Sequence, residues 1–339
     1  MDKPITFSVI MPCYNSAAYV KNAIDSIKNQ TYPHWELIAV NDGSKDETPE
    51  ILHAYAKEDD RIKVFEKENG GYVSAVNLGL GHISGDYFLF LGSDDTLNVD
   101  LFEILFRHLS PLNALPDGIA FRAIKIKDGV FFERDTFSDF DTVAYESNIT
   151  FKAFCEKHPK HAEIFSCRDT SKCFKTQKLN DLRYFGKYGI DADGIFSSLF
   201  YHTCQSFISI PYDGYLWTIR NDSLSSSTSL VKELDRIDNW KLFFERLDEM
   251  SLGANITIEA LSHISLQCFL LISLCKGFKN AIKYRRFIRQ HLTFIKYVAK
   301  KYNAEEFLDR KIGFLRFSPP LFSLLHKLGV WSLLHKLHK

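Results

Sequence analysis

Two adjacent carboxylates at the end of an apolar run are the side chains of this sequence best suited to chemistry. Asp94 and Asp95 follow residues 87–91, an uninterrupted apolar stretch that ends at Gly92. Such a stretch predicts a strand buried on both faces, as inside a parallel sheet. Two like charges side by side are unfavourable unless a cation or hydrogen-bond donors lie between them. The pair therefore predicts a site for Mg²⁺ or Mn²⁺, and the alternative is that Asp94 only caps the helix that follows.

Polar side chains recur after three earlier strand-like runs. Asn15, Asp42 and Asn69 each come shortly after a β-rich run, and a helical pattern follows each of them. Strands and helices that alternate at this spacing predict an α/β fold with a mostly parallel sheet and helices on both faces. In such sheets, ligands bind beyond the carboxyl ends of the strands. We therefore expect these three side chains to meet Asp94 and Asp95 at one edge of the sheet.

The elements that must position these residues can be read from the apolar periodicity. Strands are expected at residues 7–11, 35–40, 61–65, 87–91, 118–127, 129–133, 207–211 and 215–220. Helices are expected after residues 16, 46, 73, 100 and 193. Residues 118–133 predict a hairpin with Asp128 and Gly129 at its turn. Residues 134–165 carry no pattern that assigns them. No G-x-G-x-x-G or G-x-x-x-x-G-K-[ST] motif occurs, which disfavours a dinucleotide-binding enzyme or a P-loop ATPase.

Composition predicts a packed protein of a reducing compartment. The chain has 339 residues, no net charge and seven cysteines without a C-x-x-C pair, which indicates free thiols. The amino terminus has no basic and apolar pattern of an export signal. Apolar segments are too short to cross a bilayer comfortably. We expect a cytoplasmic protein without a membrane-spanning helix.

Charge is distributed unevenly along the chain. From residue 255 to the end, fifteen Lys or Arg stand against four acids, so the first 254 residues are as acidic as this tail is basic. Residues 231–339 have a helical pattern that interleaves these basic residues with Phe, Leu and Trp. Basic amphipathic helices suit the interface of an anionic membrane, here the inner face of the cell membrane. The alternative is that they pack on the catalytic domain. Nucleic acid is disfavoured, because the acidic part would repel its phosphates.

The order of these motifs resembles family 2 of the glycosyltransferases, the inverting enzymes of the GT-A fold. Residues 7–15 are similar to the opening strand and loop of that family, and residues 40–44 to its nucleotide-contacting turn. Residues 69–77 are similar to its Gly-rich segment, and residues 85–95 to its strand that ends in the metal-binding carboxylates. The resemblance is tight over residues 5–110. It is looser around Asp193 and over residues 215–225, and nothing general matches beyond about residue 230.

The resemblance implies a domain organisation. Residues 1–230 would form the GT-A domain, with a nucleotide-sugar-binding half at 1–110 and an acceptor-binding half at 111–230. Residues 231–339 would be the basic helical extension.

The resemblance also implies a nucleotide-sugar donor, most often a UDP-sugar, and a role for individual residues. Asp42 would accept a hydrogen bond from a pyrimidine N–H, Asp94 would bind ribose or sugar hydroxyls, and Asp95 would hold the metal. The metal would neutralise charge on the departing diphosphate. The other residues expected at the donor are Pro12, Tyr14, Asn15, Asn69, Gly70, Asn77 and Ser93. One departure from the family is Val76, where an Arg often precedes the Asn.

A carboxylate on the other side of the sugar must take the proton of the attacking acceptor hydroxyl. The family places its acid pair near Asp193, but the usual adjacent Glu-Asp is here Asp191-Ala192-Asp193. Asp193 is therefore the expected base and Asp191 the reserve, whereas either could simply cap a helix. A single displacement would invert an α-linked donor into a β-linked product.

These expectations amount to a metal-dependent hexosyltransferase. Its acceptor would be a saccharide or lipid-linked saccharide of a surface polysaccharide, such as capsule or O-antigen. The alternatives are a nucleotide-sugar-binding protein without activity and a protein that only binds a membrane surface. A nucleotidyltransferase is disfavoured, because residues 12–18 lack the Gly and Arg that would hold a triphosphate.

Overall fold

The computed structural model describes residues 4–127, 129–134, 140–166, 168–185 and 192–220, together with the single positions 239, 297 and 300. Contacts divide the chain into two compact units, residues 1–223 and residues 224–339. Every helix and strand with described bounds lies in the first unit. The predicted basic helices of residues 231–339 lie outside the described residues, apart from the three single positions.

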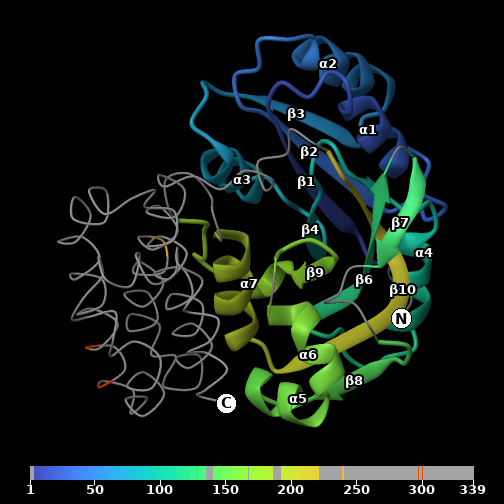
Figure 1. The fold of residues 1–339 in the computed structure, drawn as a ribbon, viewed down its shortest axis with the longest axis vertical. Helices are drawn as coiled ribbons and strands as arrows, with labels where there is room; N and C mark the ends of the chain where they lie inside the picture. The colour runs from blue at the N-terminus through green and yellow to red at the C-terminus, as the bar shows by residue number, and fades with distance from the viewer. Residues whose placement is uncertain are drawn as a thin grey trace, which may run out of the picture. The chain divides into compact units, whose positions relative to one another are not determined.

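The first part of the sheet is parallel, as the alternating pattern predicts (Figure 1). Its strands are β1 (Phe7–Cys13), β2 (Trp35–Asn41), β3 (Ile62–Glu66) and β4 (Tyr87–Phe90). Strand β1 lies between β2 and β4, so that Phe7 is opposite both Trp35 and Tyr87. All four residues of β4 are buried, which confirms the prediction of a strand covered on both faces.

The second part of the sheet is mixed. Its strands are β5 (Thr96–Leu97), β6 (Gly118–Lys127), β7 (Val130–Arg134), β8 (Ala144–Ser147), β9 (Lys172–Lys175) and β10 (Ser206–Thr218). The order across the sheet is β3-β2-β1-β4-β9-β6-β10-β5, with β7 paired to β6 and β8 paired to β10. Strands β6 and β10 are parallel, whereas β9 is antiparallel to both β4 and β6. The expected parallel pairing is therefore continuous across β1 to β4, and among the described strands beyond β4 it recurs between β6 and β10.

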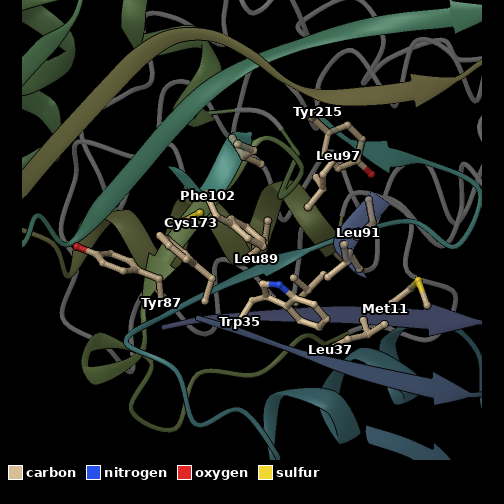
Figure 2. Close-up of a cluster of buried hydrophobic side chains, with 14 of the residues drawn as sticks. Met11, Trp35, Leu37, Tyr87, Leu89, Leu91, Leu97, Phe102, Cys173 and Tyr215 are labelled. Carbon is tan, nitrogen blue, oxygen red and sulfur yellow. The ribbon is translucent and has the colours of Figure 1, made fainter. Parts of the chain in front are cut away.

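Helices cover both faces of the sheet, as expected for this class (Figure 1). One face packs against α1 (Val20–Lys28), α2 (Thr48–Glu58) and α4 (Leu101–Leu109). The other packs against α3 (Tyr72–Leu80), α5 (Phe151–Lys157), α6 (Pro159–Ser166) and α7 (Ala192–His202). A 3₁₀ turn, η2 (Thr176–Lys178), follows β9. Figure 2 shows how side chains from β1, β2, β4, β9, β10 and α4 form the first of these two cores.

The prediction of two strands at residues 207–211 and 215–220 is wrong, because the structure has one continuous strand, β10, over Ser206–Thr218. Residues 212–214 separate the two predicted strands, but the chain continues through them as one strand with register shifts against β6. A side chain at Gly214 would come within 2.4 Å of Leu101 Cδ1 and 2.8 Å of Phe121 Cδ2. The glycine therefore permits close packing against α4 and β6. This continuity carries β10 to the carboxyl edge of the parallel strands.

Glu36, near the amino end of β2, connects this strand by hydrogen bonds to β1, to β3 and to the segment before β4. Its carboxylate accepts hydrogen bonds from Ser8 Oγ at 2.6 Å, from Ser84 N at 2.6 Å and from Lys63 Nζ at 2.7 Å. Burial alone would raise the pKa of Glu36, but these donors outweigh it and lower the pKa below its ordinary value. A carboxyl group with a lowered pKa stabilises the fold above its unfolded pKa, and this contribution is lost as the pH falls through the folded value.

We predict that Glu36→Gln destabilises the protein by about 1–3 kcal/mol at pH 7. The substitution replaces the carboxylate by an amide, which cannot accept hydrogen bonds from all three donors. Denaturant unfolding measured from pH 7 down to pH 3 is the test. The loss should shrink as the pH falls through the lowered pKa of the folded state, because the wild-type carboxyl then takes up a proton. A loss of equal size at both ends of this range would contradict the assigned charge state.

Candidate active site

The carboxyl ends of β1, β2 and β4 bring the predicted polar residues to one edge of the sheet. The loop after β1 is tied to the loop after β4 by a hydrogen bond between Ser16 Oγ and Ser93 Oγ at 2.7 Å. It is also tied to the loop after β2, because Asn15 Oδ1 accepts from Lys45 N at 2.8 Å. The expected convergence of these loops is therefore present. Pro12 lies within β1, and Tyr14 is half exposed directly after it.

Asp42 holds the Gly-rich segment. Its side chain is buried, Oδ1 accepts from Gly70 N at 2.9 Å, and Oδ2 accepts from Gly71 N at 2.8 Å. Lys67 Nζ lies 2.5 Å from Oδ1 and forms an ion pair with it. The contact of Asp42 with a pyrimidine N–H stays a prediction, and the contacts observed in the structure are those of its oxygens with this loop and with Lys67. The carboxylate therefore fixes the loop that the resemblance assigns to the donor.

Gly43 shows how closely the Gly-rich segment approaches the loop after β2. It has a positive φ of 68°, and a Cβ at this position would lie 2.8 Å from the backbone nitrogen of Asn69. The residue must therefore be glycine both for its backbone angle and for this approach. Asn69 and Gly70 are thus placed beside Asp42, as the sequence reading expects.

Asp94 and Asp95 have different partners. Asp94 Oδ2 forms an ion pair with Arg220 Nη2 at 2.8 Å. Asp95 is buried, and it accepts from Tyr215 Oη at 2.6 Å and from Thr218 N at 2.8 Å. Burial and the charge of Asp94 together raise the pKa of Asp95 to about 7. Neither carboxylate caps α4, because that helix has no side-chain cap.

This pair fits a divalent cation of the Mg²⁺ or Mn²⁺ type. The donors are hard oxygens, and such ions are typically held by one or two carboxylates with substrate phosphates completing the shell. The raised pKa of Asp95 indicates that its negative charge is undercompensated by Arg220 and the hydrogen bonds. Among the described residues, no group of three or more His, Cys, Asp or Glu could hold a metal. An ion here would therefore depend on these two carboxylates and on the substrate.

Gly92 leaves room for both carboxylates. A Cβ at this position would lie 2.8 Å from Asp95 Oδ2 and 2.9 Å from Asp94 Oδ1. We predict that Gly92→Ala displaces one or both side chains and lowers transfer on the order of 10²-fold, the usual effect of misplacing catalytic groups by about 1 Å. Steady-state kinetics with a nucleotide sugar, together with Mn²⁺ titration, would measure this. Unchanged Mn²⁺ affinity and unchanged kinetics would show that the carboxylates need no such space.

Asp193 lies in the first turn of α7, as the sequence predicts. Burial and Asp169 raise the pKa values of Tyr72 and Tyr184, and the charge of Asp193 adds to this effect. Asp193 therefore lies near both tyrosines. The position of Asp193 relative to Asp94 and Asp95 remains a prediction. The reserve base, Asp191, lies outside the described residues.

Asn77 has a role that the sequence reading does not give it. Its Nδ2 donates to the carbonyl oxygen of Tyr184 at 2.8 Å, and its Oδ1 accepts from Tyr184 N at 2.8 Å. This paired contact joins α3 to the segment that leads toward α7. A donor contact by Asn77 stays a prediction, and the observed role is to hold the backbone.

Several residues of the site are missing from the sequence reading. Arg220 lies within residues 215–225, where the family resemblance is looser, so the sequence did contain a signal for it. Its guanidinium also lies 4.6 Å from the ring centroid of Tyr19. Lys67 and Asp169 belong to no sequence motif. Their part in the site follows only from their contacts in the structure, with Asp42 and with Tyr72.

Comparison with known proteins gives this geometry a family. Residues 8–172 match the family described as Glycosyl transferase family 2. The glycosyltransferase GlyA of Streptococcus pneumoniae serotype 4 is 31% identical over 227 residues, which is 66% of this chain and 32% of GlyA. GlyG of the same organism is 28% identical over 220 residues, 64% of this chain and 72% of GlyG. The match thus spans about a third of GlyA.

Solved structures show the same fold. A crystal structure of S. aureus TarS residues 1–349 in complex with UDP-GlcNAc superposes with a TM-score of 0.67 at 18% identity. The match covers 96% of this chain and 92% of that one. TarS 1–349 in complex with UDP superposes with a TM-score of 0.54 at 19% identity. These matches confirm the predicted GT-A fold.

Proposed function

The chain belongs to glycosyltransferase family 2, and from this membership we propose that it moves a sugar from a UDP-sugar to a hydroxyl of a saccharide or lipid-linked saccharide with inversion. The observation that carries the proposal is the convergence of Asp94, Asp95 and Arg220 with the Asp42-bound Gly-rich loop at one sheet edge. The donor class is supported by TarS, whose crystal structures hold UDP-GlcNAc and UDP.

Each group of the site has a part in this reaction. The backbone of the Gly-rich loop, fixed by Asp42, would lie along the donor, with Tyr14 and Asn15 beside the base. Asp95 would hold Mn²⁺ or Mg²⁺, which would supply Lewis-acid stabilisation of the leaving diphosphate, and Asp94 would bind ribose or sugar hydroxyls beside it. Arg220 would add a fixed positive charge at the same place. The nucleoside diphosphate could then depart without a general acid.

Asp193 would act on the acceptor side. Its carboxylate would take the proton from the acceptor hydroxyl as the oxygen attacks the anomeric carbon in line with the departing diphosphate. The bond to the diphosphate breaks as the new glycosidic bond forms, so an α-linked donor gives a β-linked product. Asp191 is the other candidate for this role. We propose the acceptor to be a precursor of a surface polysaccharide such as capsule or O-antigen.

The test of the donor is a panel of UDP-sugars with Mn²⁺, scored by UDP release and by calorimetric binding. We expect at least one sugar nucleotide to bind with Mn²⁺ and more weakly without it. Binding of none would overturn the proposal. Binding without turnover on any acceptor would favour the alternative of a nucleotide-sugar-binding protein.

Contact with an anionic membrane surface is a separate part of the proposal. The described part of the chain contains no helix that is both long and apolar enough to cross a bilayer. The basic residues of the segment 231–339 support surface binding instead. Deletion of residues 305–339 should release the protein from anionic vesicles in a sedimentation assay. Equal binding of both forms would refute the role of this segment.

A further inference from the structure

Asp169 is a buried carboxylate that has no role in the proposed mechanism. It connects the donor side of the site with the acceptor side. The side chain of Asp169 lies just before β9 and is almost fully buried. Its Oδ2 accepts a hydrogen bond from Tyr72 Oη at 3.1 Å, and the same oxygen accepts one from Tyr184 Oη. The two rings lie 6.1 Å apart between centroids, at 72° to each other. One oxygen therefore joins two tyrosines that stand more than 100 positions apart in the sequence.

Tyr72 belongs to the donor side. It is the first residue of α3 and directly follows Gly71, whose N–H donates to Asp42 at 2.8 Å. The hydroxyl bond to Asp169 therefore anchors the loop from one end while Asp42 holds it from the other. Movement of the Tyr72 ring would move the backbone of the Gly-rich segment.

Tyr184 belongs to the acceptor side. Its backbone is clamped by Asn77, and its side chain stacks on Phe196 of α7, with centroids 4.5 Å apart. Helix α7 carries Asp193 in its first turn. Because Asp193 also raises the pKa of both tyrosines, its charge is close to the pair.

Energetics suggest why a carboxylate occupies this place. Burial raises the pKa of Asp169, and the Tyr184 hydroxyl, Lys172 and the Tyr72 hydroxyl act against this. Lys172 is itself buried, and its ammonium group donates to the carbonyls of Arg168 and Thr170. A buried polar network whose members are hydrogen-bonded in this way fixes the geometry of the groups that it joins.

We propose that Asp169 is a positioning residue of the transfer reaction, which sets the Gly-rich donor loop and helix α7 at a fixed separation through Tyr72 and Tyr184. This inference rests on the proposed function, because it assigns the loop to the donor and α7 to the base. It predicts that the two tyrosines affect different kinetic constants. Tyr72 governs how well the donor is held, and Tyr184 governs the chemical step.

The experiment compares Tyr72→Phe, Tyr184→Phe and Asp169→Leu with the wild type in steady-state kinetics on a UDP-sugar with Mn²⁺. We expect Tyr72→Phe to raise the donor KM about tenfold and Tyr184→Phe to lower kcat by a similar factor, as small misplacements do. Asp169→Leu should show both effects. Asp169→Asn keeps an oxygen that can accept both hydroxyls, and it should recover most of the activity lost in Asp169→Leu.

Tyr55→Phe is the matched control. It removes a hydrogen bond of the same type, from Tyr55 Oη to Asp25 Oδ1 at 2.8 Å, between α2 and α1. Its melting temperature should fall as in the other tyrosine variants while kcat and KM stay at wild-type values. If Tyr72→Phe and Tyr184→Phe behave like this control, the cluster is only structural and the inference is wrong.

The same assay distinguishes a failure of the positioning role of Asp169 from a failure of the proposed glycosyltransferase function. Wild-type protein that releases no UDP from any sugar nucleotide would overturn both. Wild-type turnover with unchanged constants in the Asp169 and tyrosine variants would overturn only the positioning role. Should Asp169→Leu fail to fold, the two Tyr→Phe variants still decide the question.

Discussion

Asp95→Asn is expected to abolish metal-dependent transfer, with a loss of at least about 10³-fold in kcat/KM. The substitution removes the buried charge that would hold the ion, while the amide can still accept from Thr218 N, which donates to Asp95 at 2.8 Å. The loop should therefore keep its shape. Steady-state kinetics over a Mn²⁺ titration would measure the effect, and an intact rate would show that this carboxylate does not hold the metal.

The same variant should gain stability when no divalent ion is present. Because burial and Asp94 raise the pKa of Asp95 to about 7, the folded protein loses stability as the pH rises through that value. Between pH 6 and pH 8 the wild-type loss should be about 1 kcal/mol, and Asp95→Asn should lack it. Unfolding in EDTA at the two pH values tests this.

Asp59→Asn is a suitable control for both measurements. Asp59 lies before β3, at the end of the strands opposite the site, and pairs with Arg61 at 2.7 Å. Its pKa is lowered mainly by that arginine, so the variant should be less stable at pH 7. Its transfer rate should remain unchanged.

The opposite effects of Asp95→Asn on activity and stability would have one physical source. Within the part of the chain that the structure describes, Arg220 pairs with Asp94, and the two adjacent carboxylates still carry more negative charge than their surroundings compensate. A folded protein that bears this cost is poised to bind a cation, since binding removes the repulsion. Arg220 reduces the cost but, as a fixed side chain, it cannot bridge to a substrate phosphate and both carboxylates as an ion can.

The local pattern of apolar and acidic residues in the sequence is sufficient to predict strands and helices that depend only on their neighbours in sequence. The apolar run before Gly92 predicts β4, and the acids near residue 193 predict the start of α7, because each depends on neighbours in sequence. Convergence of Asp42 and Asp94 follows from a general rule of parallel sheets. The rule depends on the direction of the strands and not on side-chain detail, so the alternating pattern of the sequence is enough to apply it.

Partners that come from distant segments could not be predicted in this way. Tyr215 donates to Asp95 across 120 positions, and Tyr72 donates to Asp169 across 97. Asp42 is a further example, because its binding of Lys67 and the loop depends on how β3 ends beside it. No periodicity encodes these contacts. The contact of Tyr215 also depends on β10 running unbroken through residues 212–214, which separate two strands in the prediction from the sequence.

Asp193→Asn is expected to lower kcat on the order of 10²- to 10⁴-fold, because the acceptor hydroxyl would lose the group that takes its proton. Binding of UDP and Mn²⁺ should be unchanged, since Asp193 lies in α7 and not in the loops that bear Asp42 and Asp95. Turnover kinetics and calorimetry on one preparation would measure both. Asp59→Asn again serves as the control for an unrelated carboxylate.

The comparison of Asp193→Asn with Asp191→Asn identifies the base. Asp193 lies in the first turn of α7, where the helix dipole favours a negative charge. Full activity in Asp193→Asn with loss in Asp191→Asn would transfer the role to the neighbour. Loss in neither would exclude a carboxylate of this pair, and a product with retained configuration by NMR would exclude the single displacement itself.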